Sequence, residues 1–325
     1  MTTAEIPVER PSPFGPLAAV RPAQRFLSAV LKFVRTKPLG AFGALLVVFF
    51  VFMAMFSPWI APYDATRSVD APLLKPSTDH WLGTDSVGKD VFSRVLVGSQ
   101  ISLAIAVSVV AINVTLSTTL GLLAGYFQGP IDYVIQRSGE IWSAFPGLIA
   151  LLLIVSLLGP PHTEGTKSGF LAIFQIMWDM RNLVFAFSIG AVFGGSRIVR
   201  GVSLSLKNSE YVTAARALGA SDLRIIFRHL LPNVMPYVIV GATAGVGAVI
   251  LGEAALSFLG LGVAPGTPSW GQDLSGRNRQ FFTHAWWIAV APGAAISLTV
   301  LGFNLLGDAL RDVLDPRLRG TRGGR

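Results

Sequence analysis

Few residues in this sequence have a type and spacing suited to chemistry. Residues 83–90 read GTDSVGKD, which nearly matches the phosphate-binding pattern G-x-x-x-x-G-K-[ST]. The last position holds Asp90, whose carboxylate would repel a phosphate, and no strand is expected before it. Neither a G-x-S-x-G nor an H-E-x-x-H sequence is present. No metal-ligand spacing links the four histidines, His80, His162, His229 and His284. We therefore expect no catalytic residue, cofactor site or metal site in this chain.

Composition places the chain in a membrane. Of its 325 residues 52% are hydrophobic and only 14% are charged, with a mean hydropathy of +0.59. A soluble domain of this length needs more charge on its surface. The absence of cysteine excludes disulfides and thiolate metal sites. The net charge of +8 is expected to reflect membrane orientation, since no basic stripe with interleaved aromatics indicates nucleic-acid binding.

The apolar segments predict an all-α integral membrane protein with six transmembrane helices. A helix needs about 20 apolar residues to cross the hydrocarbon core. The predicted spans are residues 38–63, 101–127, 141–159, 182–206, 235–260 and 286–307. The fourth reaches full length only if Arg197 and Arg200 extend toward the headgroups. The two arginines could instead contact a partner chain.

Charge counting supports six spans with both termini on the cytoplasmic side. That side then holds 18 of the 26 lysines and arginines, as the positive-inside rule requires. The predicted organisation is a cytoplasmic tail (1–37), a first transmembrane helix (38–61), an extracytoplasmic loop (62–98), a core (99–310) that contains helices two to six and a loop at 207–233, and a cytoplasmic tail (311–325). The first residues have a disordered composition, and no cleaved signal peptide is expected.

The 207–233 loop is expected to fold as two short helices outside the membrane. Ser209 can cap the first helix, and Glu210 would lie in its first turn, where its charge suits the helix dipole. Gly219 can end that helix because glycine adopts the left-handed conformation. After Ala220, Ser221 or Asp222 can cap a second helix, which runs to about Leu231 and is stopped by Pro232.

Small side chains on the first of these helices suit contact with another protein. Ala214, Ala215 and Ala217 would let the backbone of a partner come close. A short helix with such a face fits into a groove of the partner.

The 207–233 loop resembles the EAA loop of bacterial ATP-binding-cassette import permeases. The family pattern is Glu-Ala-Ala, three residues, Gly, nine residues, then Ile, any residue and Leu-Pro. Ala214, Ala215, Gly219, Leu231 and Pro232 match it at the right spacing. The chain departs from the pattern at two positions, Thr213 for the family's Glu and His229 for its Ile. The first departure puts a salt bridge from position 213 to an ATPase in doubt, for which Glu210 is a candidate substitute.

Longer blocks resemble the C-type permeases of the dipeptide, oligopeptide and nickel group. They are HWLGTDSVGKDVFSRVLVGSQISL (80–103), LLAGYFQGPID (122–132), RALGASDLRIIFRHLLPN (216–233), EAALSFLGLGVAPGTPSWG (253–271) and FNLLGDALRDVLDPRLRG (303–320). The resemblance implies the type I importer permease fold in the bacterial inner membrane. It also implies a second, related permease, two ATPase subunits or one fused ATPase that bind ATP and Mg, and an extracytoplasmic solute-binding protein. The implied cargo is a di- or oligopeptide, with nickel and oligosaccharides as alternatives.

Three residues toward the outer side are candidates for contact with the solute or its binding protein. Glu253 is the one acid inside a predicted span, so it should face protein or water. It would contact the amino terminus of a peptide or make a structural hydrogen bond. Pro268 and Trp270 lie in an outer loop that would touch the binding protein or simply form a turn.

Two other classes of protein compete with this interpretation. An ion-driven secondary transporter or channel would show broken helices or buried acids in matching halves, and only Glu253 fits. Transport by the isolated chain would favour this class. A membrane-embedded enzyme would need paired polar residues at membrane depth, and hydrolase activity of the isolated chain would indicate it.

Overall fold

The fold of the chain is all-helical in a computed structural model that describes residues 22–159 and 172–314. Within these residues the only β feature is an isolated bridge between Thr84 and Asp90. The elements are α1 (Pro22–Thr36), α2 (Pro38–Ile60), α3 (Val91–Phe127), α4 (Gly129–Ser143), α5 (Gly147–Leu158), α6 (Ala172–Asp179), α7 (Arg181–Lys207), α8 (Glu210–Ala217), α9 (Asp222–Ile225), the π-helical turn η1 (Ile226–Leu230), α10 (Leu231–Phe258), α11 (Trp270–Asp273), the 3₁₀ turn η2 (Asn278–Phe281) and α12 (Trp287–Leu314). The all-α prediction is confirmed.

Five helices in the described residues are long and apolar enough to cross a membrane. They are α2, α3, α7, the continuous helix from α9 through α10, and α12. A sixth crossing is reached if the bent pair of α4 and α5 counts as one span. Five of the six predicted spans therefore correspond to single long helices, and the third corresponds to this bent pair.

The third predicted span is broken. The helices α4 and α5 meet at an angle of 91°. Pro146 lies at the break, with φ −58° and ψ 122°, immediately before α5. Proline disfavours helical conformation in the residue before it, so α4 ends and a new helix starts. Its 12 residues make α5 only about 18 Å long, too short to cross the hydrocarbon core alone.

The fourth predicted span is one helix, α7, of 27 residues. It includes both Arg197 and Arg200, as a fourth span of full length requires. Arg200 pairs through two nitrogens with both carboxylate oxygens of Asp132 on α4. Arg197 is exposed beside Gly139 of α4. Arg200 therefore joins α7 to α4 within this chain. The sequence had predicted either an anchor at the headgroups or a contact with a partner chain for this residue, and not this ion pair.

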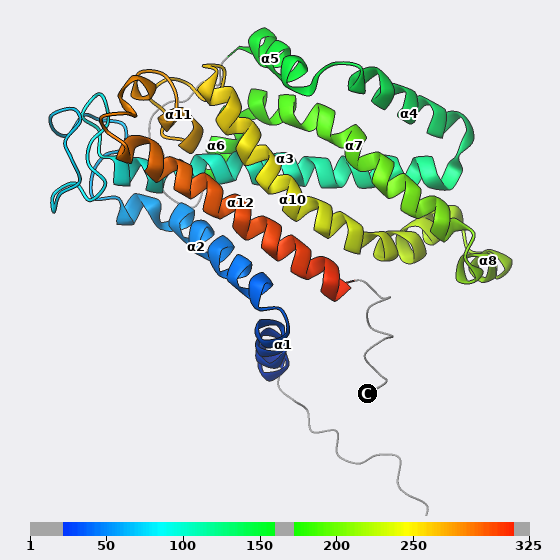
Figure 1. The fold of residues 1–325 in the computed structure, drawn as a ribbon. Helices are drawn as coiled ribbons and strands as arrows, with labels where there is room; N and C mark the ends of the chain where they lie inside the picture. The colour runs from blue at the N-terminus through cyan, green and yellow to red at the C-terminus, as the bar shows by residue number, and fades with distance from the viewer. Residues whose placement is uncertain (1–21, 160–171, 315–325) are drawn as a thin grey trace, which may run out of the picture. The chain divides into compact units, whose positions relative to one another are not determined.

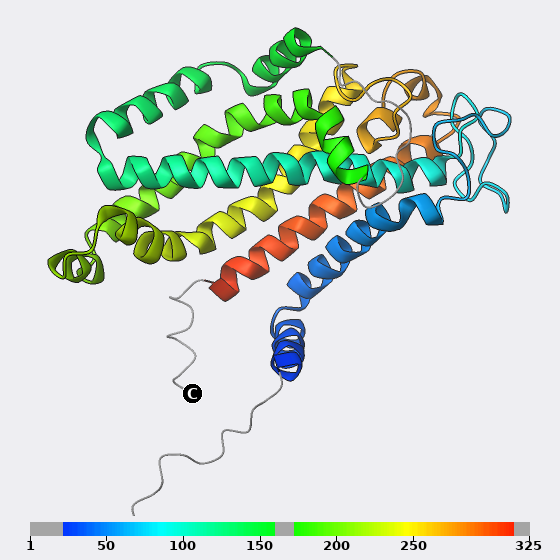
Figure 2. The ribbon, with the colours of Figure 1, turned by 180° about the vertical axis from the view of Figure 1, so that it is seen from behind.

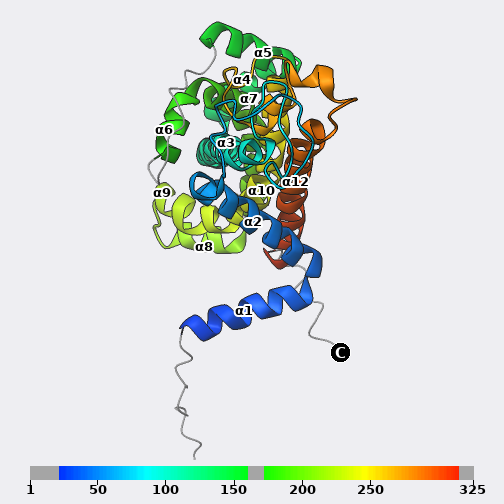
Figure 3. The ribbon, with the colours of Figure 1, turned by 90° about the vertical axis from the view of Figure 1, so that its left-hand side faces the viewer.

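The helix α3 is the centre of the bundle. In its most apolar window 78% of residues are buried, against at most 39% in the other candidate spans. Figure 3 shows α3 surrounded by its neighbours, and the view from behind in Figure 2 shows it running alongside α7 and α10. Its 37 residues correspond to about 55 Å, well beyond the roughly 30 Å of a hydrocarbon core.

Two glycines allow α3 and α7 to pack closely. A Cβ added to Gly121 would lie 2.5 Å from Cβ of Val199, and one added to Gly125 would lie 2.5 Å from Cβ of Ser203. Gly121 and Gly125 are four residues apart, which is the small-xxx-small spacing of close membrane helix pairs. Because these glycines have no side chain, the backbone of α3 packs directly against α7 at Gly121 and Gly125.

Several predicted boundaries shift. The helix α3 begins at Val91, about ten residues before the predicted span, because Asp90 caps it by accepting a hydrogen bond from the Ser93 amide (2.8 Å). Residues 91–98 of the predicted outer loop are therefore helical. At the other end, α12 extends to Leu314, into the predicted C-terminal tail.

The predicted N-terminal tail contains α1, which belongs to a separate unit that ends at Pro38. The segment expected to be disordered, at the start of the chain, lies outside the described residues. In the main unit, residues 61–90 and α11 gather at one end of the bundle, and α8 lies at the other end (Figure 1).

Candidate functional site

The 207–233 loop begins with α8, which starts where the sequence predicts. Ser209 occupies the N-cap position and Glu210 lies in the first turn. The predicted capping bond is wrong, however. The Ser209 hydroxyl donates to the carbonyl of Leu206 (2.6 Å), the last turn of α7, instead of accepting from α8. Ser209 therefore ties α8 to the helix before it.

Gly219 forms the corner of the loop. Its φ is +81°, the left-handed region, as predicted. The Gly219 amide bonds to the carbonyl of Arg216 (2.9 Å) and the Ala220 amide to that of Ala215 (3.0 Å). These two bonds are the Schellman motif that closes a helix C-terminus. Nothing lies within 4 Å of an added Cβ, so glycine is required for its backbone conformation alone.

The second part of the loop corrects the prediction that Pro232 stops a helix. Ser221 precedes α9, which passes through η1 directly into α10. Proline in a regular α-helix clashes with the carbonyl four residues earlier. In the wider turn, the Leu231 amide bonds to the carbonyl of Ile226, five residues earlier, and Pro232 falls in the first turn of α10. The widened turn accommodates the proline without ending the helix.

A polar cluster fastens the loop to the end of α3. The Tyr126 hydroxyl donates to the Asp222 carboxylate (2.5 Å), and Lys207 Nζ donates to the Tyr126 carbonyl (2.6 Å). Beneath them, Val212 and Ile225 are fully buried. Sequence reasoning missed this anchor, because Tyr126 lies almost 100 residues before Asp222.

The other side of the loop is exposed. Thr213 and Ala214 of α8 are solvent-accessible, as is Gly219, and Ala215 is half-buried. Leu218, beside the corner, is 89% exposed, and Leu223 and Phe227 are 63% exposed each. Large apolar side chains this open favour a protein contact. These three residues were not among the predicted coupling residues, although a leucine directly before the corner glycine was a visible signal.

Glu253, Pro268 and Trp270 come together at the other end of the bundle. All three side chains are buried, Glu253 at 1% exposure and Trp270 at 0%. Trp270 Nε1 donates to the Val95 carbonyl (3.0 Å), and its ring packs edge-on against Phe50. Because they are covered by this chain, these side chains present no surface to a binding protein in this conformation. A role in the solute path stays a prediction.

The Glu253 carboxylate has three hydroxyl donors. It accepts hydrogen bonds from Ser257 (2.8 Å), Ser269 (3.0 Å) and Ser102 (3.3 Å). These donors come from α10, from the residue before α11, and from α3. The contacts support the structural hydrogen-bond interpretation of Glu253.

Replacing Glu253 should therefore affect stability in a graded way. Glu253→Ala removes the shared acceptor and is expected to lower the free energy of unfolding by about 1–3 kcal/mol. Glu253→Gln keeps an acceptor oxygen and should cost less. Thermal unfolding of the detergent-purified protein measures both, and equal losses in the two variants would contradict this role.

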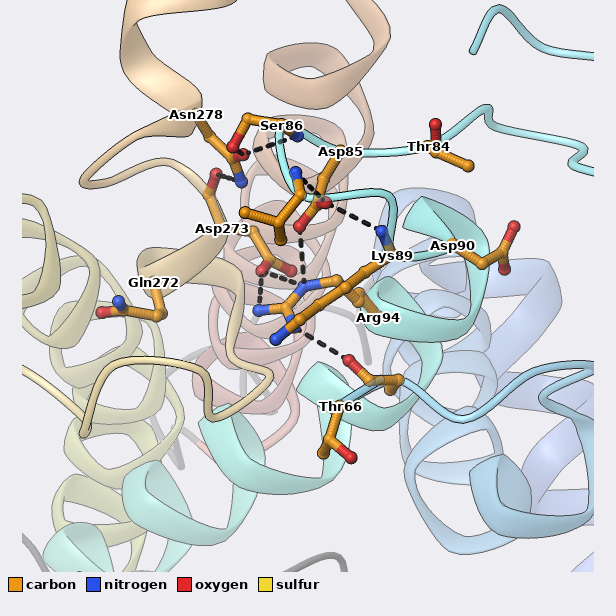
Figure 4. A network of polar contacts seen from close by, with 12 residues as sticks. Thr66, Thr84, Asp85, Ser86, Lys89, Asp90, Arg94, Gln272, Asp273 and Asn278 are labelled. Carbon is orange, nitrogen blue, oxygen red and sulfur yellow. Dashed lines mark hydrogen bonds and ion pairs between the residues drawn. The ribbon is translucent and has the colours of Figure 1, made fainter. Parts of the chain in front are cut away.

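A second polar network lies beside this cluster, at the same end (Figure 4). The Arg94 guanidinium bonds through two nitrogens to Asp273 (2.7 Å from Nε) and donates to the Ala65 carbonyl (2.9 Å). Asp85 lies 4.0 Å from Arg94. Burial, with the nearby charge of Arg94, lowers the pKa of Lys89 from its ordinary value. The network thus joins residues 61–90, α3 and α11.

The GTDSVGKD segment is part of this network and does not form a phosphate cradle. The Asp85 carboxylate accepts hydrogen bonds from the amides of Val87 (2.8 Å) and Lys89 (2.9 Å). Amides of this kind would bind a phosphate in a nucleotide-binding loop. Asp90, the residue that departs from the pattern, caps α3 and contacts buried His80 (2.9 Å). The segment serves to hold the start of α3.

Known proteins resemble this chain along most of its length. Residues 117–320 match the family model described as binding-protein-dependent transport system inner membrane component. Residues 26–76 match the N-terminal transmembrane domain of oligopeptide transport permease C. The glutathione transport system permease protein GsiD of Escherichia coli O6:K15:H31 is 43% identical over 288 residues, 88% of this chain and 89% of that protein. GsiD of Shigella boydii serotype 4 shows the same values, and that of Pectobacterium atrosepticum is 40% identical over 290 residues, 89% of this chain and 90% of the relative.

Proposed function

This chain belongs to the family of binding-protein-dependent transport system inner membrane components, and we propose that it carries di- or oligopeptides. As a family member it is a multi-pass permease subunit of an ATP-binding-cassette importer in the inner membrane. In our proposal it forms half of the translocation path, with both termini in the cytoplasm. ATP hydrolysis in separate subunits drives the transport.

The peptide cargo is supported by what the relatives are named for. GsiD is a glutathione transport permease, and glutathione is a tripeptide. The N-terminal match is to a permease of oligopeptide transport. Nickel and oligosaccharides are the alternative cargoes for the same machinery.

The observation that carries the coupling mechanism is the corner at Gly219. A short helix with an exposed face of small residues ends there, and a nearly fully exposed leucine stands beside it. We propose that this corner docks into an ATPase subunit, with Glu210, Thr213, Ala214 and Ala215 at the contact. The ATPase chains bind ATP and Mg, and nucleotide binding there shifts the membrane helices between two states.

The assembly in this proposal has further members. A second homologous permease supplies the other half of the path, and two ATPases or one fused ATPase supply the energy. An extracytoplasmic solute-binding protein delivers the peptide to the end of the bundle opposite α8.

Reconstitution of the complete importer in lipid vesicles tests the proposal. Radiolabelled trialanine and S-methylglutathione should accumulate only when binding protein and ATP are both present. Uptake of nickel or an oligosaccharide in place of either peptide would overturn the cargo assignment. Peptide uptake by the isolated chain without an ATPase would overturn the coupling mechanism.

Gly219→Val tests the docking corner. A β-branched residue is strained by about 1–2 kcal/mol in the left-handed conformation, so the native corner becomes about tenfold less populated. Co-purification of the ATPases should fall by a similar factor while membrane insertion is retained. The matched control is Gly260→Val, because Gly260 has φ +84°, closes α10 with the same pair of bonds and has equally open surroundings at the other end. Equal ATPase recovery in the two variants would contradict the role of the corner.

A further inference from the structure

A cavity of about 230 Å³ lies between α3, α7 and α10. Asn113 and Ser117 of α3, Gly195 of α7, and Tyr237, Gly241 and Gly245 of α10 are among its lining residues. Asn113, Gly195 and Gly245 each lie in the central third of their helix. The cavity is therefore within the membrane-spanning part of the bundle, away from both the 207–233 loop and the Glu253 cluster.

The polar groups of this cavity have no hydrogen-bond partner among the described residues. This holds for the Asn113 amide and for the hydroxyls of Ser117 and Tyr237. On the same helix, the hydroxyls of Ser108 and Thr115 each donate to a carbonyl one turn earlier (2.6 and 2.8 Å), whereas the Thr118 hydroxyl, outside the cavity, also has no partner among the described residues. A polar group without a partner is costly at membrane depth, so these groups, which open onto the cavity, are available to bond a ligand or water there.

Two of these groups point toward the same spot on α7. A Cβ added to Gly195 would lie 2.9 Å from the Ser117 hydroxyl oxygen and 3.2 Å from the Asn113 side-chain oxygen. On α10, nothing lies within 4 Å of a Cβ added to Gly241. Gly195 thus lets α7 pack closely against the polar side chains of α3, and Gly241 leaves open space on the α10 wall for another molecule's backbone.

We propose that Asn113, Ser117 and Tyr237 bind the peptide group of the solute as it crosses the membrane. This inference rests on the proposed function and deepens it. A side-chain amide donates and accepts hydrogen bonds, as a peptide group does, and the two hydroxyls can do both as well. No charged residue lines the cavity. The site therefore recognises the neutral peptide backbone and tolerates different side chains on the solute.

Thiol labelling tests occupancy directly, because the native chain contains no cysteine. In the complete importer, Gly241→Cys should react on this chain with a water-soluble maleimide. Saturating trialanine or S-methylglutathione, which have no free thiol, should slow the reaction at least fivefold. Gly201→Cys, at an exposed glycine of α7 outside the cavity, is the control and should react at the same rate with and without peptide.

Transport kinetics provide the second measurement. Asn113→Leu keeps the approximate volume and removes the amide, so KM for trialanine uptake should rise about five- to tenfold. Asn113→Gln should recover part of this loss. The control is Asn304→Leu on α12, an exposed asparagine outside the cavity, which should leave KM unchanged.

The outcomes separate this inference from the proposed function. If the unmodified importer takes up peptide, a wild-type KM in Asn113→Leu together with unprotected labelling of Gly241→Cys overturns the inference alone. Labelling of Gly241→Cys only by lipid-soluble reagents also overturns it, since the cavity would then face lipid. If the unmodified importer transports no peptide, the proposed function fails and the inference fails with it.

Discussion

Asp273→Ala is expected to lower the free energy of unfolding by about 3–5 kcal/mol. The Arg94 guanidinium is 5% exposed and directs two of its nitrogens at Asp273. Without that carboxylate a buried positive charge keeps only the Ala65 carbonyl and a distant Asp85, at 4.0 Å. Removing one partner of a buried pair is costly because the charge that remains has lost its solvent as well as its counter-ion.

A double-mutant cycle distinguishes the pair from mere loss of packing. Arg94→Met combined with Asp273→Ala removes both charges and should be less destabilised than the sum of the single variants by about 0.5–3 kcal/mol. Arg67→Ala is the control, because its pair with Asp64 is exposed (83% for Arg67) and such pairs contribute about 1 kcal/mol or less. Thermal unfolding in detergent reports all four. A loss in Asp273→Ala no larger than that in Arg67→Ala would contradict the expectation.

Gly125→Val should separate α3 from α7 and destabilise the chain by about 1–3 kcal/mol or more. A Cβ at this position would lie 2.5 Å from the Ser203 Cβ and 2.9 Å from the Arg200 carbonyl oxygen. One of these atoms belongs to the backbone and cannot rotate away. The two helices must therefore move apart, which opens the packing along their whole contact.

Two comparisons sharpen this test. Gly194→Val on α7 has open space around the added atoms, so it reports the cost of losing a helical glycine without a clash. Gly125→Ala combined with Ser203→Gly exchanges the small residue across the interface and should recover part of the stability lost in Gly125→Ala. If Gly125→Val melts at the same temperature as Gly194→Val, the close approach of the helices does not limit stability.

Hydropathy and charge were sufficient to locate the helices that could cross the membrane. The long helix α7 follows from an apolar run that arginine side chains can extend. The corner at Gly219 follows from glycine's access to positive φ, and it was predicted to the residue. Both are local properties of the chain, which is why sequence reasoning reached them.

Two prolines marked where local reasoning failed. Pro146 divides the third predicted span into helices at 91°, although the run of apolar residues continues across it. Pro232 was expected to end a helix, yet the π-helical turn before it lets the helix continue. Hydropathy does not register a bend, and proline rules alone do not include the widened turn that accommodates the ring.

The contacts between distant segments could not be predicted from the sequence. Arg94 and Asp273 are 179 residues apart, and the cavity beside Asn113 takes walls from three helices. Asn113 was visible as a polar residue in an apolar span, but only the packed bundle shows that its amide has no partner among the described residues. The family resemblance supplied the predicted coupling residues, and it gave no indication of this cavity.

The unbroken run from Asp222 to Phe258 has a mechanical consequence. Its 37 residues measure about 55 Å, so one helix that starts beside the Gly219 corner is long enough to cross the full thickness of a bilayer. Near the other end of this helix, Glu253 accepts hydrogen bonds from Ser102 of α3 and from Ser269, the residue before α11. If an ATPase moves the corner, as proposed above, the helix must either tilt about the Glu253 contacts or break them. Gly241 and Gly245 lie near the middle of this helix, so the same tilting would widen or narrow the cavity that they line.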